Sequence, residues 1–177
     1  MAEKYDIAIA GAGMAGASLA ACLAPSARVL LLEAEEQPGY HATGRSAAFW
    51  TESYGGPGVQ PLTTASGAWL QDNGFLKARG ALTLAKAGQE AEAEAFAQRY
   101  RALGVAVDLF DRAEIEARVP GLRQGWAVGA YEPECRDIDV AGVHQHYLAA
   151  ARKSGAELWS SARLVSAALH GSGWRLG

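Results

Sequence analysis

The feature that most constrains the fold is a glycine-rich turn near the amino terminus. Residues 11–16 have the pattern GxGxxG and follow a short apolar segment at residues 5–10. Residues 17–24 are small and helix-forming, and residues 28–32 predict a second strand that ends in Glu33. A strand, a glycine turn, a helix, a second strand and an acid, in this order, are typical of a unit that binds a dinucleotide.

Each residue of this pattern has a physical task. Gly11 permits the sharp turn, Gly13 lets backbone N–H groups approach a pyrophosphate, and Gly16 lets the helix and the strand touch closely. The amino terminus of the helix carries a partial positive charge and unpaired N–H donors, which suit a diphosphate. Glu33 follows about twenty residues after the glycines, where a carboxylate can accept hydrogen bonds from both ribose hydroxyls.

A membrane span is an alternative interpretation of the same stretch. Residues 7–25 carry no charge and are about long enough to cross a bilayer. Glycine and alanine supply most of this run, however, and charged residues lie close on both sides. Glu3 and Asp6 stand where a secretory signal carries basic residues. We therefore expect neither a transmembrane segment nor a signal peptide.

The composition limits the classes of partner. The 177-residue chain is 50% apolar and 20% charged, as in a globular protein, and its net charge of −3 comes from scattered residues. Because there is no basic stripe, we expect no nucleic-acid partner. Cys22, on a helix expected to be buried, and Cys135 are expected to be reduced thiols, which favours a cytoplasmic location. No CxxC or clustered His/Cys pattern predicts a metal.

A second segment is expected to face the nucleotide. Residues 34–44 form a polar loop with glycine and proline, which begins where the second strand ends. Residues 45–53 predict a helix opened by Thr43 or Gly44, with Arg45 in its first turn. Because an arginine is unfavourable against the helix dipole there, we expect it to bind an anionic phosphate. A surface arginine without a partner is the alternative.

The rest of the chain alternates predicted helices and strands. Periodicity and turn signals predict helices over residues 59–72, 89–103 and 139–153, and a short helix capped by Asp111 and Glu114. Strands are predicted over residues 81–85, 105–110, 126–131 and 157–160. A hairpin is predicted around residues 170–173. The strand at residues 157–160 is expected to return to the first sheet. The predicted fold class is therefore α/β, a Rossmann-type parallel sheet with an inserted α+β segment over the ligand crevice.

The sequence also resembles a known family. Residues 33–48, with the sequence EAEEQPGYHATGRSAA, resemble the FAD-dependent D-amino acid oxidase/dehydrogenase (DAO) family, most closely its D-arginine dehydrogenase branch. The resemblance covers the whole chain and continues at residues 53–55, 131–133, 137–139 and 144–148. It implies an FAD-binding domain formed by residues 1–53 and 138–177, with residues 54–137 as an inserted segment of a substrate domain.

In that family FAD binds in an extended form, with its adenosine at the first unit and its flavin under the insertion. By resemblance, the cofactor contacts come from the glycine turn (Gly11, Gly13, Ala15, Gly16), the end of the second strand (Glu33, Ala34), the segment after it (Ala42, Thr43, Gly44, Arg45, Ser46, Ala47, Ala48) and a later strand (Leu164). Glu33 would hold the ribose, and the backbone of Leu164 would contact the adenine. Tyr54 matches a tyrosine near the flavin that helps to close the substrate pocket; the alternative is a hydrophobic lid contact.

Departures from the D-arginine dehydrogenase branch bear on the substrate and on the cofactor. Phe49 replaces a histidine beside the flavin. Around residues 79–82 the branch has an acidic residue that binds the basic side chain of the substrate, where this chain has alanine. A neutral or apolar amino acid therefore fits at least as well as D-arginine. His41 lies where some related dehydrogenases tether FAD covalently, whereas the closer branch holds FAD without a covalent bond.

Three functional hypotheses follow. In the first, the chain is the amino-terminal half of an FAD-dependent enzyme that oxidises the CH–NH2 group of a D-amino acid or a related amine by hydride transfer to flavin N5. In the second, it is a truncated and inactive nucleotide-binding fragment. In the third, it belongs to a related flavin oxidoreductase that acts on a 2-hydroxy acid or on glycerol phosphate.

Further expectations concern the whole protein. Family members have a carboxyl-terminal half that we expect to be absent here, together with the tyrosine and arginine that clamp the substrate carboxylate. We therefore expect the isolated chain to purify without yellow colour, and the reading frame beyond Gly177 to separate the first two hypotheses. The expected partners are a small amino acid substrate and an electron acceptor, either oxygen or a quinone; a quinone would bring peripheral membrane contact.

Overall fold

The computed structural model describes residues 4–41 and 43–177. Its contacts divide the chain into two compact units, Met1–Ala47 with Asp139–Gly177, and Ala48–Ile138. The first unit ends before β3 (Phe49–Trp50), because β3 pairs with β8 (Arg136–Ile138) inside the second unit. Residues 48–53 thus lie in the second unit, whereas the sequence-based division kept them in the first. The assignment of the two units to FAD and to substrate stays a prediction.

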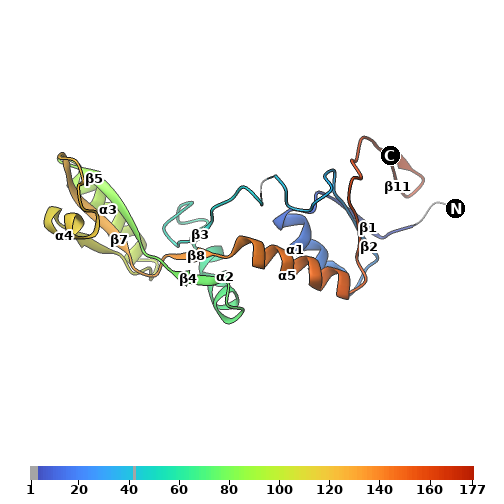
Figure 1. Cartoon of the computed structure of the whole chain (residues 1–177), viewed down its shortest axis with the longest axis horizontal. Helices are drawn as coiled ribbons and strands as arrows, with labels where there is room; N and C mark the ends of the chain where they lie inside the picture. Colours follow the sequence, from blue (N-terminus) through green and yellow to red (C-terminus); the bar gives the residue numbers. More distant parts are fainter. Residues whose placement is uncertain (1–3, 42) are drawn as a thin grey trace. The chain divides into compact units, whose positions relative to one another are not determined.

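The first unit is built on a parallel sheet with the strand order β1-β2-β9 (Figure 1). The strands are β1 (Ile7–Ala10), β2 (Val29–Leu32) and β9 (Glu157–Trp159). β1 runs parallel to β2, with Ile7 opposite Val29, and β9 runs parallel to β2 on its other side. β2 is buried along its whole length, as expected for the centre of a parallel sheet. The predicted Rossmann-type α/β class is confirmed.

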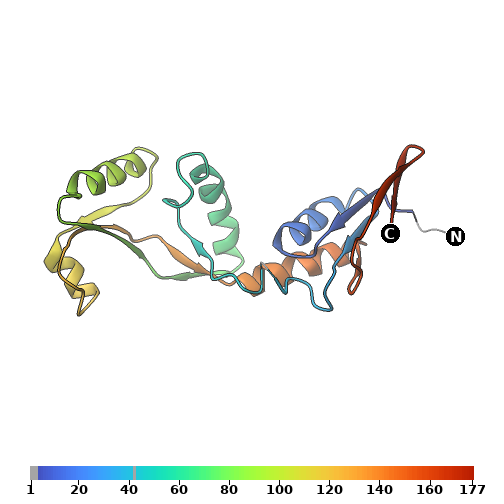
Figure 2. The same cartoon turned by 90° about the horizontal axis from the view of Figure 1, so that it is seen from above.

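Two helices cover one face of this sheet, as Figures 1 and 2 show. They are α1 (Met14–Leu23) and α5 (Val140–Lys153), and they pack against each other. α1 contributes Ala17 and Ala20 to the core, both with no exposed surface, and α5 contributes Ala151. Because these side chains are small, the helix backbones come close to each other and to the sheet.

The alternative of a membrane span at residues 7–25 is wrong. These residues form β1, the glycine turn and α1, which is a helix of 10 residues. Within residues 4–41 and 43–177, the structure has no helix that is both long enough and apolar enough to cross a bilayer.

The two cysteines are free, and their environments differ. Cys22 was expected to be buried with α1 but is exposed, because α1 turns Ala17 and Ala20 toward the core and Cys22 lies outside that stripe. Cys135 is completely buried in the second unit. Burial, together with the nearby charge of Glu132, raises the pKa of the Cys135 thiol, so this thiol is neutral at neutral pH.

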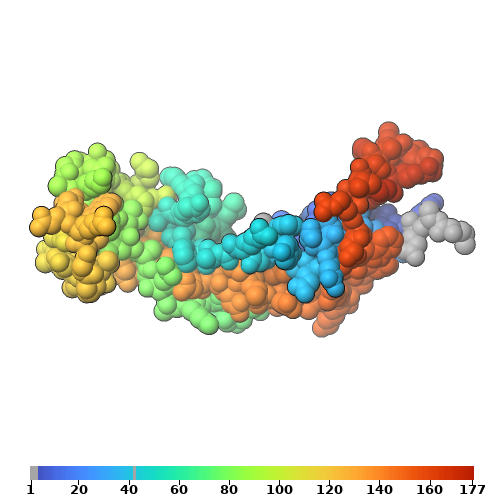
Figure 3. All heavy atoms as spheres, turned by 45° about the horizontal axis from the view of Figure 1, so that its top comes forward, coloured from blue at the N-terminus to red at the C-terminus, as the bar shows by residue number. Residues whose placement is uncertain are grey.

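The predicted hairpin closes the described part of the first unit. β10 (Ala167–His170) pairs antiparallel with β11 (Gly173–Leu176), as the sequence predicted. Figure 3 shows this red segment projecting from the surface, and Trp174 and Leu169 are 69% and 70% exposed. The hairpin is held by its own strand pairing and adds no buried side chain to the core of the unit.

The second unit, all of whose residues are described, contains two antiparallel sheets and three helices. One sheet has the order β3-β8-β4, with β4 at Leu76–Ala78, and the other has the order β5-β7-β6, with strands Ala81–Lys86, Trp126–Glu132 and Asp108–Phe110. The helices are α2 (Gln60–Asp72), α3 (Glu90–Arg101) and α4 (Arg112–Arg118). α4 begins with the predicted capping box of Asp111 and Glu114.

The helix predicted over residues 45–53 is wrong. Residues 43–45 form a turn, and the strand β3 follows at Phe49–Trp50. The indole Nε1 of Trp50 donates to the Thr63 carbonyl at 2.7 Å. Its ring lies so close to α2 that a Cβ on Gly67 would sit 2.6 Å from it. These contacts to α2, together with the pairing of β3 and β8, outweigh the local preference for a helix.

Candidate nucleotide-binding site

The glycine turn between β1 and α1 is tightly built. Gly11 has a φ of +95°, which favours glycine, and its N–H donates to the Leu32 carbonyl at 2.7 Å. A Cβ on Gly16 would lie 1.9 Å from the Gly11 carbonyl oxygen, so only glycine fits at residue 16 without a shift of the backbone. Gly13 is the N-cap residue of α1. The turn therefore brings the first N–H groups of α1 to the carboxyl edge of the sheet.

Glu33 points at this turn from the end of β2. Its Oε2 accepts the Ala12 N–H at 2.9 Å and its Oε1 accepts the Glu35 N–H at 3.0 Å. Burial alone would raise the pKa of this carboxyl, but the backbone donors of Glu35 and Ala12 outweigh burial and hold the pKa below its ordinary value. The Ala34 N–H also lowers the pKa of this carboxyl, so three backbone donors act on it. A carboxylate has about four acceptor positions, which leaves one for a ribose hydroxyl.

The lowered pKa of Glu33 predicts a pH-dependent contribution to stability. A carboxyl whose pKa is lower in the folded state stabilises the fold above its ordinary pKa of 4.5, and this contribution is lost as the pH falls through the folded value. In urea titrations, we expect the difference in unfolding free energy between wild type and Glu33→Gln to be constant near pH 7 and to shrink below pH 4.5.

The matched control for Glu33→Gln is Glu36→Gln, which changes an exposed acid in the same loop. It should leave the pH profile of the unfolding free energy unchanged. A Glu33→Gln profile that stays parallel to wild type through the acid range would contradict the assigned role of the Glu33 carboxylate.

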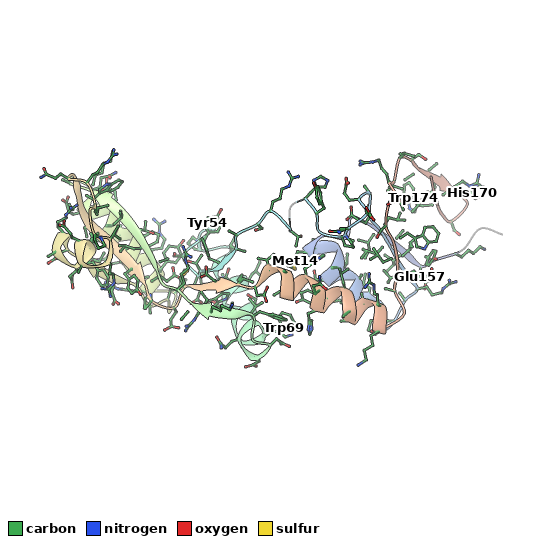
Figure 4. The ribbon with its side chains drawn as sticks, in the orientation of Figure 1. Met14, Tyr54, Trp69, Glu157, His170 and Trp174 are labelled. Atoms are coloured by element: carbon green, nitrogen blue, oxygen red, sulfur yellow. The ribbon has the colours of Figure 1, made fainter. Side chains whose placement is uncertain are left out.

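Thr43 joins the second loop to the first turn of α1. Its side chain is buried, and its Oγ1 accepts the Met14 N–H at 2.8 Å (Met14 is labelled in Figure 4). A Cβ on Gly13 would come within 3.2 Å of the same oxygen. Thr43 thereby satisfies one unpaired donor of α1 from outside the helix. Because its oxygen accepts this bond, its hydroxyl proton remains available for an anion.

Arg45 lies in a series of turns rather than at the start of a helix. The Gly44 N–H donates to the Gly39 carbonyl at 2.5 Å, and the Arg45 N–H donates to the His41 carbonyl at 3.2 Å. The Arg45 guanidinium lies over the Tyr40 ring, 5.4 Å from its centroid. Stacking on an aromatic ring restrains a long side chain, so a cation is held on the loop that carries Thr43.

A third segment reaches the same edge of the sheet after β9. The Ala162 N–H donates to the Glu33 carbonyl at 2.8 Å, and the Ser161 N–H donates to the Glu35 carbonyl at 2.9 Å. Ser161 has a φ of +53°, the only positive φ of a non-glycine residue in the part of the chain that the structure describes. Leu164, which is 38% exposed, follows Ala162 by two residues. It lies in an irregular segment between β9 and β10 (Ala167–His170) and not on a strand as predicted, because the chain there pairs with the loop after β2.

His144 is a functional candidate that the sequence reasoning missed. It is 5% exposed, and its Nε2 lies 2.7 Å from the Ala12 carbonyl oxygen. The signal was present, because residues 144, 148 and 151 follow a helical spacing that places them on the buried face of α5. Among the described residues, no group of three or more His, Cys, Asp or Glu side chains could hold a metal ion.

Tyr54, which is labelled in Figure 4, lies in the second unit after β3 and is 78% exposed. The residues before it are anchored by Glu132, which is 3% exposed at the end of β7. The Glu132 carboxylate accepts the Thr51 hydroxyl at 3.0 Å, the Ser53 hydroxyl at 2.5 Å and the Glu52 N–H at 2.8 Å. A buried carboxylate with three donors fixes the backbone that leads into Tyr54.

The predicted site residues are thus distributed over both units. The first unit brings together the glycine turn, the end of β2, the second loop and the segment after β9, with the residues Gly11, Gly13, Ala15, Gly16, Glu33, Ala34, Thr43, Gly44, Arg45, Ser46, Ala47 and Leu164. Ala48 and Tyr54 lie in the second unit. Ala42 lies outside the described residues.

The edge of the first unit has the chemistry that an adenosine diphosphate group requires. A Cβ placed on Gly11 would meet no atom within 4 Å, so the turn is open on that side. The first turn of α1 and the Thr43 hydroxyl offer hydrogen-bond donors, Arg45 offers a positive charge, and Glu33 offers acceptors. Donors and a cation suit a diphosphate, and a carboxylate suits ribose hydroxyls.

Comparison with known proteins extends this result. The family model described as FAD dependent oxidoreductase (DAO) matches residues 6–177. Glycine oxidase from Geobacillus kaustophilus has a TM-score of 0.83 and 23% identity, over 99% of this chain and 51% of that chain. L-alpha-glycerophosphate oxidase from Mycoplasma pneumoniae, solved with FAD bound, has a TM-score of 0.85 and 16% identity, over 99% of this chain and 50% of that chain.

L-proline dehydrogenase from P. horikoshii is similar to the same extent, with a TM-score of 0.80 and 19% identity over 97% of this chain and 48% of that chain. At these identities the likeness concerns the fold alone. The chain spans about half the length of the solved structures that it matches.

Proposed function

The chain belongs to the family of FAD-dependent oxidoreductases, and on this premise we propose that it holds the adenosine diphosphate part of FAD at the glycine turn. We further propose that the whole protein oxidises the CH–NH2 group of a D-amino acid or a related amine. The observation that carries the binding proposal is the Glu33 carboxylate, ionised and hydrogen-bonded to the glycine turn at the carboxyl edge of β1 and β2.

In this proposal the cofactor contacts divide by chemistry. The glycine turn and the first turn of α1 hold the pyrophosphate through the N–H groups of Gly13, Ala15 and Gly16. Glu33 accepts the ribose hydroxyls, and the backbone around Leu164 borders the adenine. The second loop completes the pyrophosphate and flavin contacts with Ala34, Ala42, Thr43, Gly44, Arg45, Ser46, Ala47 and Ala48.

Bound FAD supplies the two-electron acceptor for oxidation of the substrate C–H bond. The residues of this chain contribute position and charge rather than an acid or a base. Tyr54 is proposed to close the substrate pocket, since it follows a segment that Glu132 holds rigidly. A hydrophobic contact of a lid remains the alternative role of Tyr54.

We propose a neutral or apolar amino acid as substrate, although the D-arginine dehydrogenase branch is the one that the sequence resembles. Phe49 takes the place of that branch's histidine, and the Arg79 guanidinium lies over the Phe49 ring, 4.2 Å from its centroid. Arg79 also donates to Asp137 at 3.0 Å. Because Asp137 pairs with Arg79, the support for a neutral substrate side chain is the apolar ring of Phe49 itself, together with the alanine near residues 79–82 where that branch has an acid.

A substrate panel with an electron-accepting dye tests this proposal. For the whole protein, we expect a neutral D-amino acid to reduce the dye in the presence of FAD. Reduction by a 2-hydroxy acid or by glycerol phosphate would favour the related flavin oxidoreductase. The likeness in fold to a glycerophosphate oxidase is the reason to include this second candidate. No reduction by any substrate would favour an inactive nucleotide-binding fragment.

The electron acceptor and the location are also proposals. The same assay with oxygen and with a soluble quinone identifies the acceptor, and a quinone would bring peripheral membrane contact. A cytoplasmic location is supported by the two free cysteines. A covalent tether to His41 is less consistent with the geometry, because its Nε2 lies 3.0 Å from the Glu35 carboxylate.

Arg45→Ala is expected to weaken the binding of ADP and of FAD about tenfold, which corresponds to about 1.4 kcal/mol. The reason is the loss of a positive charge that the Tyr40 ring holds on the loop that carries Thr43. Arg45→Lys should recover part of the affinity. Isothermal titration calorimetry measures the dissociation constants, with Arg175→Ala in the hairpin as a control that keeps wild-type affinity. Equal affinities of Arg45→Ala and wild type would remove Arg45 from the site.

A further inference from the structure

His144 lies at the junction of the two loops that form the candidate site. It comes from α5, and its ring is buried between the glycine turn and the second loop. On one side, its Nε2 is 2.7 Å from the Ala12 carbonyl oxygen. On the other side, a Cβ on Gly39 would lie 2.7 Å from its Cε1, so the Gly39 backbone packs directly on the ring.

The partner of His144 settles which ring nitrogen carries a proton. A carbonyl oxygen only accepts hydrogen bonds, so Nε2 must be the donor. In the neutral ring the proton is therefore on Nε2, and Nδ1 is unprotonated. This is a directed and buried contact rather than general packing, because a leucine or a phenylalanine at this position could not make it.

The bond fixes the orientation of a single peptide group. The Ala12 carbonyl belongs to the peptide that also carries the Gly13 N–H, and in a planar trans peptide the carbonyl and the N–H point in opposite directions. When His144 holds the carbonyl, the Gly13 N–H points away from α5. The Ala12 N–H is held in turn by Glu33 at 2.9 Å, so the backbone on both sides of Ala12 is restrained.

We propose that His144 is a positioning residue of the cofactor site, which holds the Ala12 carbonyl so that the Gly13 N–H faces the pyrophosphate of FAD. Its contact with Gly39 also sets the second loop, because the Gly39 carbonyl accepts the Gly44 N–H next to Thr43. Thr43 returns to α1 through the Met14 N–H. The proposal rests on the proposed function only in naming the pyrophosphate as the ligand.

Three variants of the full chain test this role, with ADP and FAD as the probes. His144→Leu removes the donor and should raise both dissociation constants about tenfold or more. His144→Gln places an amide N–H near the position of Nε2 and should bind within about threefold of wild type. Leu148→Ala, one turn further along α5, creates a cavity in the core and lowers stability, but it should keep wild-type affinity below its unfolding temperature.

Two spectroscopic measurements separate this proposal from the proposed function. In ligand-free protein, His144→Leu should shift the Gly13 amide resonance much more than Leu148→Ala does, although Leu148 belongs to the same buried cluster as Ala12. In wild type, the ¹⁵N spectrum of the His144 ring should show the proton on Nε2. If wild type binds neither ADP nor FAD, the proposed function fails, and these two measurements still test the orientation of the peptide.

Three results would overturn the positioning role. The first is a ring protonated on Nδ1 alone in wild type. The second is a Gly13 amide that does not change in His144→Leu. The third is wild-type affinity of His144→Leu for both probes. The nitrogen spectrum requires no variant, so the proposal stays testable even if His144→Leu does not fold.

Discussion

Gly16→Ala is expected to unfold the first unit and to abolish nucleotide binding. The added Cβ would lie 1.9 Å from the Gly11 carbonyl oxygen and 3.4 Å from the Ile9 side chain. The first of these contacts is with backbone, which cannot rotate away as a flexible side chain can. Either α1 moves off the sheet or the turn changes shape, so we expect a loss of about 3 kcal/mol or more in the unfolding free energy of this unit.

Hydrogen exchange measured by mass spectrometry reads the two units separately. In Gly16→Ala, peptides from residues 4–41 and 139–177 should exchange faster, while peptides from residues 48–138 should keep wild-type protection. The matched control is Gly173→Ala, since a Cβ there would meet no atom within 4 Å. Wild-type protection of α1 in Gly16→Ala would show that the turn tolerates a side chain and that its described geometry is wrong.

Glu132→Ala is expected to destabilise the second unit, as Gly16→Ala is expected to destabilise the first. Removal of the carboxylate leaves the hydroxyls of Thr51 and Ser53 and the Glu52 N–H without their acceptor. Glu132 is 3% exposed, so water does not readily replace it. We expect the second unit to lose about 3 kcal/mol of stability or more, because buried donors without partners are costly.

Two further variants calibrate the Glu132 prediction. Glu132→Gln keeps the shape and one carbonyl oxygen, and hydroxyl groups can rotate to accept from its amide, so we expect a loss of only about 1 kcal/mol. Glu134→Ala removes a nearby exposed acid that pairs with Arg136, and it should change stability by less than about 0.5 kcal/mol. Equal rates of hydrogen exchange in the second unit of Glu132→Ala and Glu134→Ala would contradict the role of Glu132 as an anchor for residues 51–53.

The parts of the fold that sequence predicts well are those with local causes. The glycine turn depends on backbone freedom at Gly11 and close contact at Gly16, and both requirements can be read from residue type and spacing. The capping box of Asp111 and Glu114 and the cap of α5 by Asp139 also depend on neighbours in the chain. The parallel pairing of β1 and β2 follows from the short connection through α1.

The features that sequence missed depend on distant partners. β3, β4 and β8 contain two or three residues each, too few for an alternating pattern, and they exist because they pair with one another. Trp50 was assigned to a helix because nothing nearby in sequence points to Gly67. His144 contacts a carbonyl that lies 132 residues earlier in the chain, and Glu132 contacts donors about 80 residues away.

The central claim is that the glycine turn, Glu33 and the Thr43 loop form a receptor for adenosine diphosphate. Titration of ADP into the ¹⁵N-labelled 177-residue chain, followed by amide chemical shifts, tests it most directly. We predict saturable shifts at residues 11–16, 33–35 and 43–46, with the amides of residues 60–132 unchanged because ADP lacks the flavin. An absence of shifts at the glycine turn at millimolar ADP, or shifts confined to the second unit, would contradict the account.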